Sequence, residues 1–198
     1  MKIIVVGGTG TIGSEVVKAL EARHEIVSIS RSSQPAVDYA RPETIAGLFA
    51  KVGAVDGVIS CAGGGVFKPL DQLTDADFEK TLQDKLMGQV RLAMAALRHL
   101  KPNGSITLTG GVMAQEPMPG GAAISLVNAG LEGFVRGAAI EAKNGVRVNL
   151  VSPPWVTETL KKFGMTSDRH LPAAHVARAY VASVEGRQRG EILDPARF

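Results

Sequence analysis

A glycine-rich turn near the N-terminus constrains the fold of this chain more than any other feature. The apolar run "KIIVVG" (2–7) leads directly into "GGTGTIG" (7–13), and a helical pattern begins at residue 11. Such a turn lets the backbone reverse tightly, approach a pyrophosphate and pack the helix closely on the strand. The free N–H groups of that helix start then face the phosphates. The residues expected around a bound dinucleotide here are Gly7, Thr9, Gly10, Thr11, Ile12 and Gly13.

Apolar runs alternate with helical patterns along the rest of the chain. Further strands are expected at 25–30, 55–63, 104–110 and 146–153, with a weaker one at 190–195, and helices at 11–23, 42–52, 75–100, 122–143 and 172–185. This alternation predicts βαβ units and a parallel sheet covered by helices on both faces. We therefore predict an α/β fold, a Rossmann-like doubly wound parallel sheet of three layers and about seven strands, as a single domain over 1–198. The segment 36–38 is either a very short strand or merely extended, because the six residues between Arg31 and Asp38 cannot form a helical crossover.

The end of the second predicted strand indicates which nucleotide the site prefers. An acidic residue at this point binds the ribose hydroxyls of NAD, whereas an arginine accommodates the 2′-phosphate of NADP. The sequence here is "SRSS" (30–33), so Arg31, with Ser32 as a hydroxyl donor, favours NADP over NAD. A solvated loop arginine is the alternative interpretation of Arg31. Asp38 is placed to accept from the adenine amino group, or else caps a turn.

Composition excludes several classes of function. The chain has 198 residues, a formal net charge of +3 and no stripe of Lys and Arg, so we expect no nucleic-acid partner. No apolar run is long enough to span a membrane, and the N-terminus does not have the pattern of a signal peptide. The single Cys61 fits a reducing compartment, and we expect a cytoplasmic protein. The four histidines share no metal-ligand spacing, so no metal site is expected.

These motifs resemble the short-chain dehydrogenase/reductase family along nearly the whole chain. The resemblance includes the turn at 7–13, Asp38 after the third strand position, "CAG" (61–63), and the stretch "GLEGFVRGAAIEAKNGVRVNLVSPPWV" (130–156). It implies an NADP(H)-binding oxidoreductase. It also adds five residues to the expected cofactor site: Cys61, Ala62, Gly63, Pro153 and Val156.

The family resemblance also sets a register for the active site. Members use an Asn-Ser-Tyr-Lys tetrad, in which the Tyr exchanges a proton with the substrate oxygen. Anchored on "GLEGF", the Tyr position falls on Ile124 and the Lys position on Asn128. The Ser position falls at or beside Gly111, and the Asn position falls on Lys85. The resemblance thus implies a small divergent member in which all four tetrad residues are replaced.

The replacements leave the chemistry open. Weak catalytic candidates are Lys85, Asn128, Ser125 and Thr109. A Lys85 held in an apolar pocket has a lowered pKa and acts as an electrostatic stabiliser or proton donor. Otherwise it only satisfies Asn128 and a backbone carbonyl, or extends its ammonium group to solvent. Neither Tyr39 nor Tyr180 is expected to reach the reacting centre.

Three function classes therefore remain. The first is an NADP(H)-dependent oxidoreductase of unknown substrate, with a non-standard proton donor or none. The second is a non-catalytic NADP-binding sensor or interaction protein, and the third is an isomerase or lyase on the same scaffold. Because the family commonly pairs its two long helices, the resemblance also implies a homodimer or homotetramer through helices 75–100 and 122–143.

Overall fold

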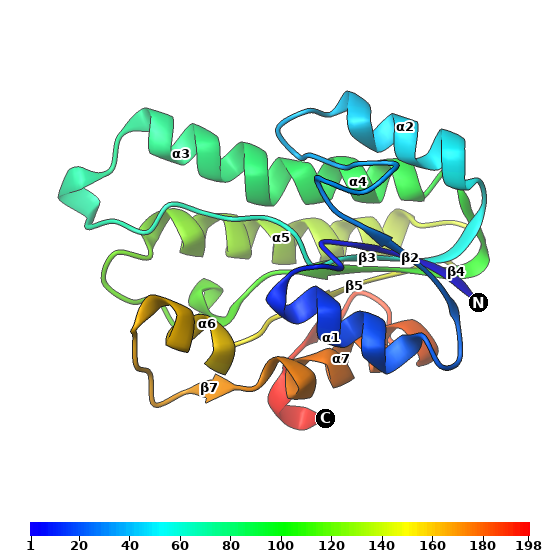
Figure 1. The fold of residues 1–198 in the computed structure, drawn as a ribbon. Helices are drawn as coiled ribbons and strands as arrows, with labels where there is room; N and C mark the ends of the chain where they lie inside the picture. Colours follow the sequence, from blue (N-terminus) through cyan, green and yellow to red (C-terminus); the bar gives the residue numbers. More distant parts are fainter.

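The computed structural model describes residues 1–198 and is built around one six-stranded parallel sheet (Figure 1). The strand order is β2-β1-β3-β4-β5-β8, and every neighbouring pair is parallel. The strands of this sheet are β1 (Lys2–Val6), β2 (Glu25–Ile29), β3 (Val55–Ser60), β4 (Leu100–Thr109), β5 (Arg147–Val151) and β8 (Ile192–Leu193). The order reverses between β1 and β3, and ligands of such sheets bind at a reversal point, outside the carboxyl ends of the strands.

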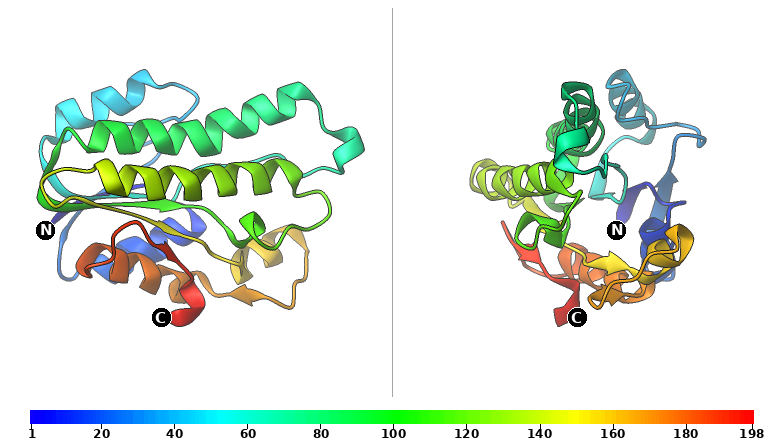
Figure 2. Two further views of the ribbon diagram at one scale, coloured as in Figure 1. Left: turned by 180° about the vertical axis from the view of Figure 1, so that it is seen from behind. Right: turned by 90° about the vertical axis from the view of Figure 1, so that its left-hand side faces the viewer.

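Helices cover both faces of the sheet, which confirms the predicted three-layer fold (Figures 1 and 2). One layer holds α2 (Glu43–Val52), α3 (Asp75–Thr81), α4 (Gly88–Ala96) and α5 (Ala122–Glu141), and the other holds α1 (Thr11–Leu20) and α7 (Ala173–Glu185). Strand β1 shows that both faces of the sheet are buried. Ile4 belongs to one apolar cluster, and its neighbours Ile3 and Val5 belong to the other. Successive side chains of a strand point to opposite faces, so an apolar run fills two cores.

The predicted helix at 75–100 is a composite rod. Helix α3 passes through a π-helical segment, Leu82–Met87, into α4, and the strand β4 begins at Leu100. The rod runs as one long element beside α5 (Figure 2). Short π-helical segments inside helices are rare and occur often at functional sites. Lys85, a catalytic candidate, lies on this segment.

The segment at 36–38 does not join the sheet, so the main sheet has six strands and not about seven. Asp38 makes only an isolated bridge with Arg41, and the Val37 N–H donates to the Ser30 carbonyl at 3.0 Å. The open alternative of an extended segment is therefore the one observed. Val37 in this segment and Tyr39 directly after it are buried, and both belong to the apolar cluster that contains Ile4 of β1.

A small unit between β5 and α7 was not predicted as secondary structure. The strands β6 (Trp155–Val156) and β7 (His170–Leu171) pair in parallel, with Trp155 opposite His170. Helix α6 (Thr157–Phe163) lies between them in the chain, and Figure 1 shows this unit at the same end of the molecule as the start of α5. The remaining elements are short 3-10 turns at Leu70–Gln72, Val112–Ala114 and Pro195–Arg197.

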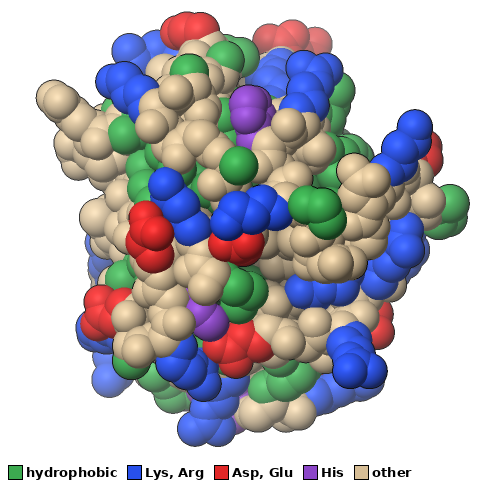
Figure 3. All heavy atoms as spheres, turned by 90° about the vertical axis from the view of Figure 1, so that its right-hand side faces the viewer, with side chains coloured by type: hydrophobic (Ala, Val, Ile, Leu, Met, Phe, Trp, Pro, Cys, Tyr) green, Lys and Arg blue, Asp and Glu red, His purple; other side chains and the backbone are tan.

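The surface around the amino ends of the strands is mixed in charge. Figure 3 shows acidic and basic side chains close together on this side. Two of the ion pairs near strand starts are Lys2–Glu25 at 3.7 Å and Lys101–Asp56 at 3.1 Å. None of the helices combines the length and the apolar character needed to cross a lipid bilayer.

Candidate functional site

The glycine turn after β1 has the geometry that its sequence predicts. Gly7 has a φ of +82°, and a Cβ there would lie 2.8 Å from the Cys61 carbonyl carbon. A Cβ on Gly13 would collide with the Gly7 carbonyl oxygen, so only glycine lets α1 pack this closely. Gly10 is the N-cap of α1 and makes no side-chain cap. The first N–H groups of a helix have no intrahelical acceptor, which leaves them free for an anion.

A cavity of about 410 Å³ opens beside this turn, at the carboxyl ends of β1, β2 and β3. Eight of the predicted cofactor residues line it: Gly7, Thr9, Gly10, Arg31, Asp38, Cys61, Ala62 and Gly63. Arg31 is exposed and makes no ion pair. Asp38 both lines the cavity and closes a turn, because its Oδ1 accepts from the Ala40 N–H at 3.1 Å.

Six predicted cofactor residues lie outside this cavity. Gly13 is buried in the helix–strand contact, and Ile12 packs partly against the core on that face. Thr11 begins α1, and the Ser32 hydroxyl faces the Ser30 hydroxyl at 3.2 Å. Pro153 and Val156 line a second cavity instead, described below.

Sequence reasoning missed six residues that line the first cavity: Val6, Ser30, Val37, Tyr39, Gly64 and Asp84. The Tyr39 hydroxyl meets the Ser60 hydroxyl at 2.7 Å, and burial raises the Tyr39 pKa well above its usual value. Its ring fills the space that a side chain on Gly88 would need. Asp84 reaches the cavity from the π-helical segment. The position of both side chains depends on tertiary packing, for which the sequence carries no local signal.

A second cavity, of about 140 Å³, lies where the β4 and β5 ends meet α5 and the π-helical segment. Its lining is mostly apolar and consists of Lys85, Gly110, Gly111, Val112, Met113, Ile124, Asn128, Pro153, Pro154, Trp155, Val156 and Thr159. Lys85 is the only titratable side chain among these residues. The cavity therefore presents one ammonium group to whatever occupies it.

Lys85 stands between the two cavities. Its Nζ donates to the Gly110 carbonyl at 3.1 Å, and removal from water lowers the pKa of its ammonium to about 8. Gly63, which lines the first cavity, packs on Lys85: a Cβ there would lie 3.2 Å from the Lys85 Cα and 3.4 Å from its Cγ. A ligand that passes over Gly63 thus reaches Lys85.

Asn128 is buried beside Lys85, but the two side chains are not hydrogen-bonded to each other. The Asn128 Nδ2 donates to the Gly111 carbonyl at 3.2 Å, one residue beyond the acceptor of Lys85. The Asn128 Oδ1 is buried without a donor. Of the alternative interpretation of Lys85, the bond to a backbone carbonyl is therefore present and the contact with Asn128 is not.

The other two catalytic candidates do not line the second cavity. Thr109 donates its hydroxyl proton to the Ser60 carbonyl and so accepts from the Tyr180 hydroxyl at 2.6 Å. Thr109, Ser60 and Tyr180 thus form a buried polar cluster between the sheet and α7. Burial also raises the pKa of the neighbouring Cys61 thiol to about 12. Ser125 has a buried hydroxyl without a partner. Tyr180 is fully buried in α7, and no tyrosine lines the second cavity.

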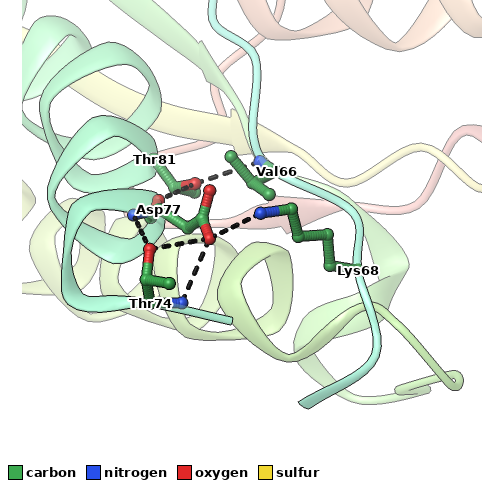
Figure 4. A network of polar contacts seen from close by, with 5 residues as sticks. All are labelled: Val66, Lys68, Thr74, Asp77 and Thr81. Atoms are coloured by element: carbon green, nitrogen blue, oxygen red, sulfur yellow. Dashed lines mark hydrogen bonds and ion pairs between the residues drawn. The ribbon is translucent and has the colours of Figure 1, made fainter. Parts of the chain in front are cut away.

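An aromatic pair stands at the second cavity. Trp155, in its lining, meets the Phe67 ring edge-on, with ring centroids 6.3 Å apart. The segment carrying Phe67 is tied to α3 by the Lys68–Asp77 ion pair at 2.8 Å and by the Val66 N–H, which donates to the Thr81 hydroxyl at 3.0 Å (Figure 4). Phe67 itself does not line the cavity, and no local sequence pattern predicts its contact with Trp155.

Comparison with known proteins identifies the family. The sequence profile of a family described as Enoyl-(Acyl carrier protein) reductase matches residues 11–188. The chain belongs to the short-chain dehydrogenase/reductase family. Among solved structures, the protein lin1944 from Listeria innocua is 36% identical, with a TM-score of 0.94 and 98% of each chain covered.

Two similar members of the short-chain dehydrogenase/reductase family are solved with nucleotide. A small-chain dehydrogenase in complex with NADPH is 26% identical, with a TM-score of 0.86 over 98% of this chain and 95% of the other. A short chain dehydrogenase from Burkholderia cenocepacia in complex with NADP is 25% identical, with a TM-score of 0.84 over 97% and 94%. Among curated proteins, the Hydroxynaphthalene reductase arp2 of Aspergillus fumigatus is 32% identical over 105 residues, which is 52% of this chain. That match covers 38% of the reductase, so this chain spans well under two thirds of it.

Side chains able to hold a metal ion are not gathered anywhere in the fold. No group of three or more His, Cys, Asp or Glu side chains has the required geometry.

Proposed function

We propose that the protein is an NADP(H)-dependent reductase that holds the nucleotide in the first cavity and a carbonyl substrate in the second. The observation that carries this proposal is the position of Lys85. It lines the substrate cavity, while its backbone and side-chain stem pack against Gly63 of the nucleotide cavity. The ends of two ligands therefore meet beside one ammonium group.

The residues around the first cavity fit a dinucleotide. The absence of Cβ atoms at Gly7 and Gly13 brings the backbone N–H groups at the start of α1 close to a pyrophosphate. Arg31 is free of acidic partners and would contact a 2′-phosphate, and the Asp38 carboxylate would accept from the adenine amino group. When bound, NADPH supplies a hydride to the carbonyl carbon.

Lys85 supplies the matching proton in this proposal. As an acid with a pKa of about 8, its Nζ donates to the carbonyl oxygen while the hydride reaches carbon, and solvent then reprotonates the neutral amine. Until its proton is transferred, the same ammonium stabilises the negative charge that develops on that oxygen. This role replaces the family's tyrosine, because the register puts Ile124 at the Tyr position and Asn128 at the Lys position.

Nucleotide binding is tested by fluorescence titration with NADPH and NADH. We expect NADPH to bind at least tenfold more tightly, as about 1.5–3 kcal/mol per charge-assisted hydrogen bond implies. Arg31→Asp should reverse or abolish that preference. Arg98→Asp, at an exposed arginine beyond the end of α4, should leave it unchanged. If neither nucleotide binds below millimolar, the cofactor assignment is wrong.

Catalysis is tested by NADPH consumption over a panel of carbonyl compounds. Lys85→Met should reduce turnover by about 10²- to 10⁴-fold while NADPH affinity is retained. Lys80→Met, at an exposed lysine on the same rod, is the matched control. Unchanged turnover in Lys85→Met would remove the proton-donor role.

A second candidate function is a non-catalytic NADP-binding sensor or interaction protein. The observation that favours it is the lining of the second cavity, which contains neither a tyrosine nor a serine. Tight NADPH binding without consumption across the carbonyl panel would support the sensor and exclude the reductase.

A further inference from the structure

We propose that the second cavity takes an uncharged ketone of one six-membered ring and that Trp155 is the residue that excludes two fused rings. This inference rests on the proposed reductase function, since it names the substrate class of that site. It depends on three properties of the cavity: its size, the set of polar groups that it offers, and the rigidity of the wall at Trp155.

The size of the cavity matches a single ring. Its volume is about 140 Å³, and an apolar protein cavity of roughly 150 Å³ accommodates benzene. The walls that would contact the ring are apolar and include Ile124, Met113, Pro153 and Pro154. A second fused ring would need space that Trp155 now fills.

The polar groups favour a neutral ketone over a carboxylate. The cavity lining contains no arginine and no acidic residue, and Lys85 and Asn128 already donate to the Gly110 and Gly111 carbonyls. A buried carboxylate needs several donors to replace its hydration. A ketone oxygen needs one, which a remaining N–H of the Lys85 ammonium provides. A single orienting group in an apolar cavity is typical of small-molecule sites.

The wall at Trp155 is held from both sides, so truncating it should enlarge the cavity and not collapse it. Its backbone pairs with β7, and its ring meets Phe67 edge-on. Phe67 is in turn backed by Gly120, where a Cβ would lie 3.1 Å from the ring. The Lys68 N–H donates to the Gly120 carbonyl at 3.0 Å, and Lys68 is also paired with Asp77.

The test compares cyclohexanone with 2-decalone by saturation-transfer NMR, a method suited to weak ligands, on the protein with NADP⁺ added, because the oxidised nucleotide cannot reduce the ketones. For the wild-type protein we expect cyclohexanone to bind at least about tenfold more tightly than 2-decalone. Trp155→Ala should shift that ratio toward 2-decalone by about tenfold or more. Phe163→Ala, at an exposed phenylalanine of α6 outside the cavity lining, is the matched control and should not change the ratio. Trp155→Leu replaces Trp155→Ala if the smaller side chain prevents folding.

Three results would overturn the inference: equal binding of the two ketones to the wild-type protein, an unchanged ratio in the Trp155 variants, or displacement of cyclohexanone by pyruvate, a small anion. Failure of the reductase function has a different signature. In that case the ring preference and its dependence on Trp155 persist in the NMR measurement, while NADPH fails to bind or is not consumed.

Discussion

Among single residues, Lys85 links stability to function most directly. Its pKa in the folded protein is about 8, against 10.5 for an exposed lysine, because burial disfavours the charge. Below pH 8 the folded protein carries this cost in full, and the cost disappears as pH rises from about 8 to above 10.5. We therefore expect Lys85→Met to increase the free energy of unfolding by about 1–3 kcal/mol at pH 7, and by progressively less at higher pH.

Urea unfolding at pH 7 and pH 10 measures this difference. Lys80→Met, at an exposed position, should show no comparable dependence on pH. A Lys85→Met variant that is less stable than wild type at pH 7 would mean that the hydrogen bond to Gly110 outweighs the burial of the charge. The expected combination, higher stability with lost turnover, is common for active-site residues.

The sequence predicts site residues best where the backbone itself imposes the choice. Gly7 and Gly13 are identifiable because the turn admits no Cβ, and Arg31 because it lies two residues beyond the end of β2. Lys85 is identifiable only through the family register. Tyr39 and Phe67 are not, because their places depend on contacts with Gly88 and Gly120, far away in the chain. A side chain that is placed by such tertiary contacts has no local pattern of its own.

Among the elements, α3 carries a tether whose strength depends on pH. Asp77 completes a capping box with Thr74 and pairs with Lys68, and these contacts lower its pKa to about 2 (Figure 4). Because the folded pKa is below the usual value of 3.8, the stabilisation is present above pH 3.8 and is lost as pH falls toward 2. Asp77→Asn should therefore lower the melting temperature at pH 7, with the difference from wild type closing near pH 2.

Thermal unfolding from pH 2 to pH 7 checks this expectation. Asp75→Asn is the matched control, since Asp75 lies in the same first turn but does not contact Lys68 or Thr74 through its side chain. An equal loss in both variants would assign the effect to the helix dipole and not to the tether.

The accuracy of the predicted elements follows the physics behind each pattern. Runs that fill two cores, such as β1 and β3, are predictable because a short, continuous apolar run between turn residues is typical of a strand buried on both faces. The helix at 75–100 is predictable, but its π-helical segment is not, because no residue type marks that geometry. The strands β6 and β7 contain two residues each and form only because they pair with each other. Two residues are too few to show a periodic pattern in the sequence, so these strands could not be predicted.

At the scale of the whole molecule, one helical layer leaves an apolar stripe uncovered. On α5 the exposed positions include Leu126, Ala129, Gly133, Gly137 and Ile140, and Figure 2 shows this helix beside the α3–α4 rod. Leu126 is 49% exposed and Ile140 is 83% exposed, and neither Gly133 nor Gly137 has a neighbour within reach of an added Cβ. A contiguous exposed apolar face of this kind is typical of an interface.

We propose that a second copy of the chain covers this stripe, giving a homodimer or homotetramer through α4 and α5. Gly133→Glu should then convert the assembly to monomers, because it places a charge in the interface while the monomer has room for the side chain. Gly47→Glu, at a helical glycine of α2 with equally open surroundings, is the matched control and should leave assembly unchanged. Size-exclusion chromatography with light scattering, at roughly 100 μM protein, well above the micromolar range of weak association, measures the mass of each variant. A wild-type protein that stays monomeric at that concentration, or a Gly133→Glu variant that still assembles, would place the contact elsewhere or remove it.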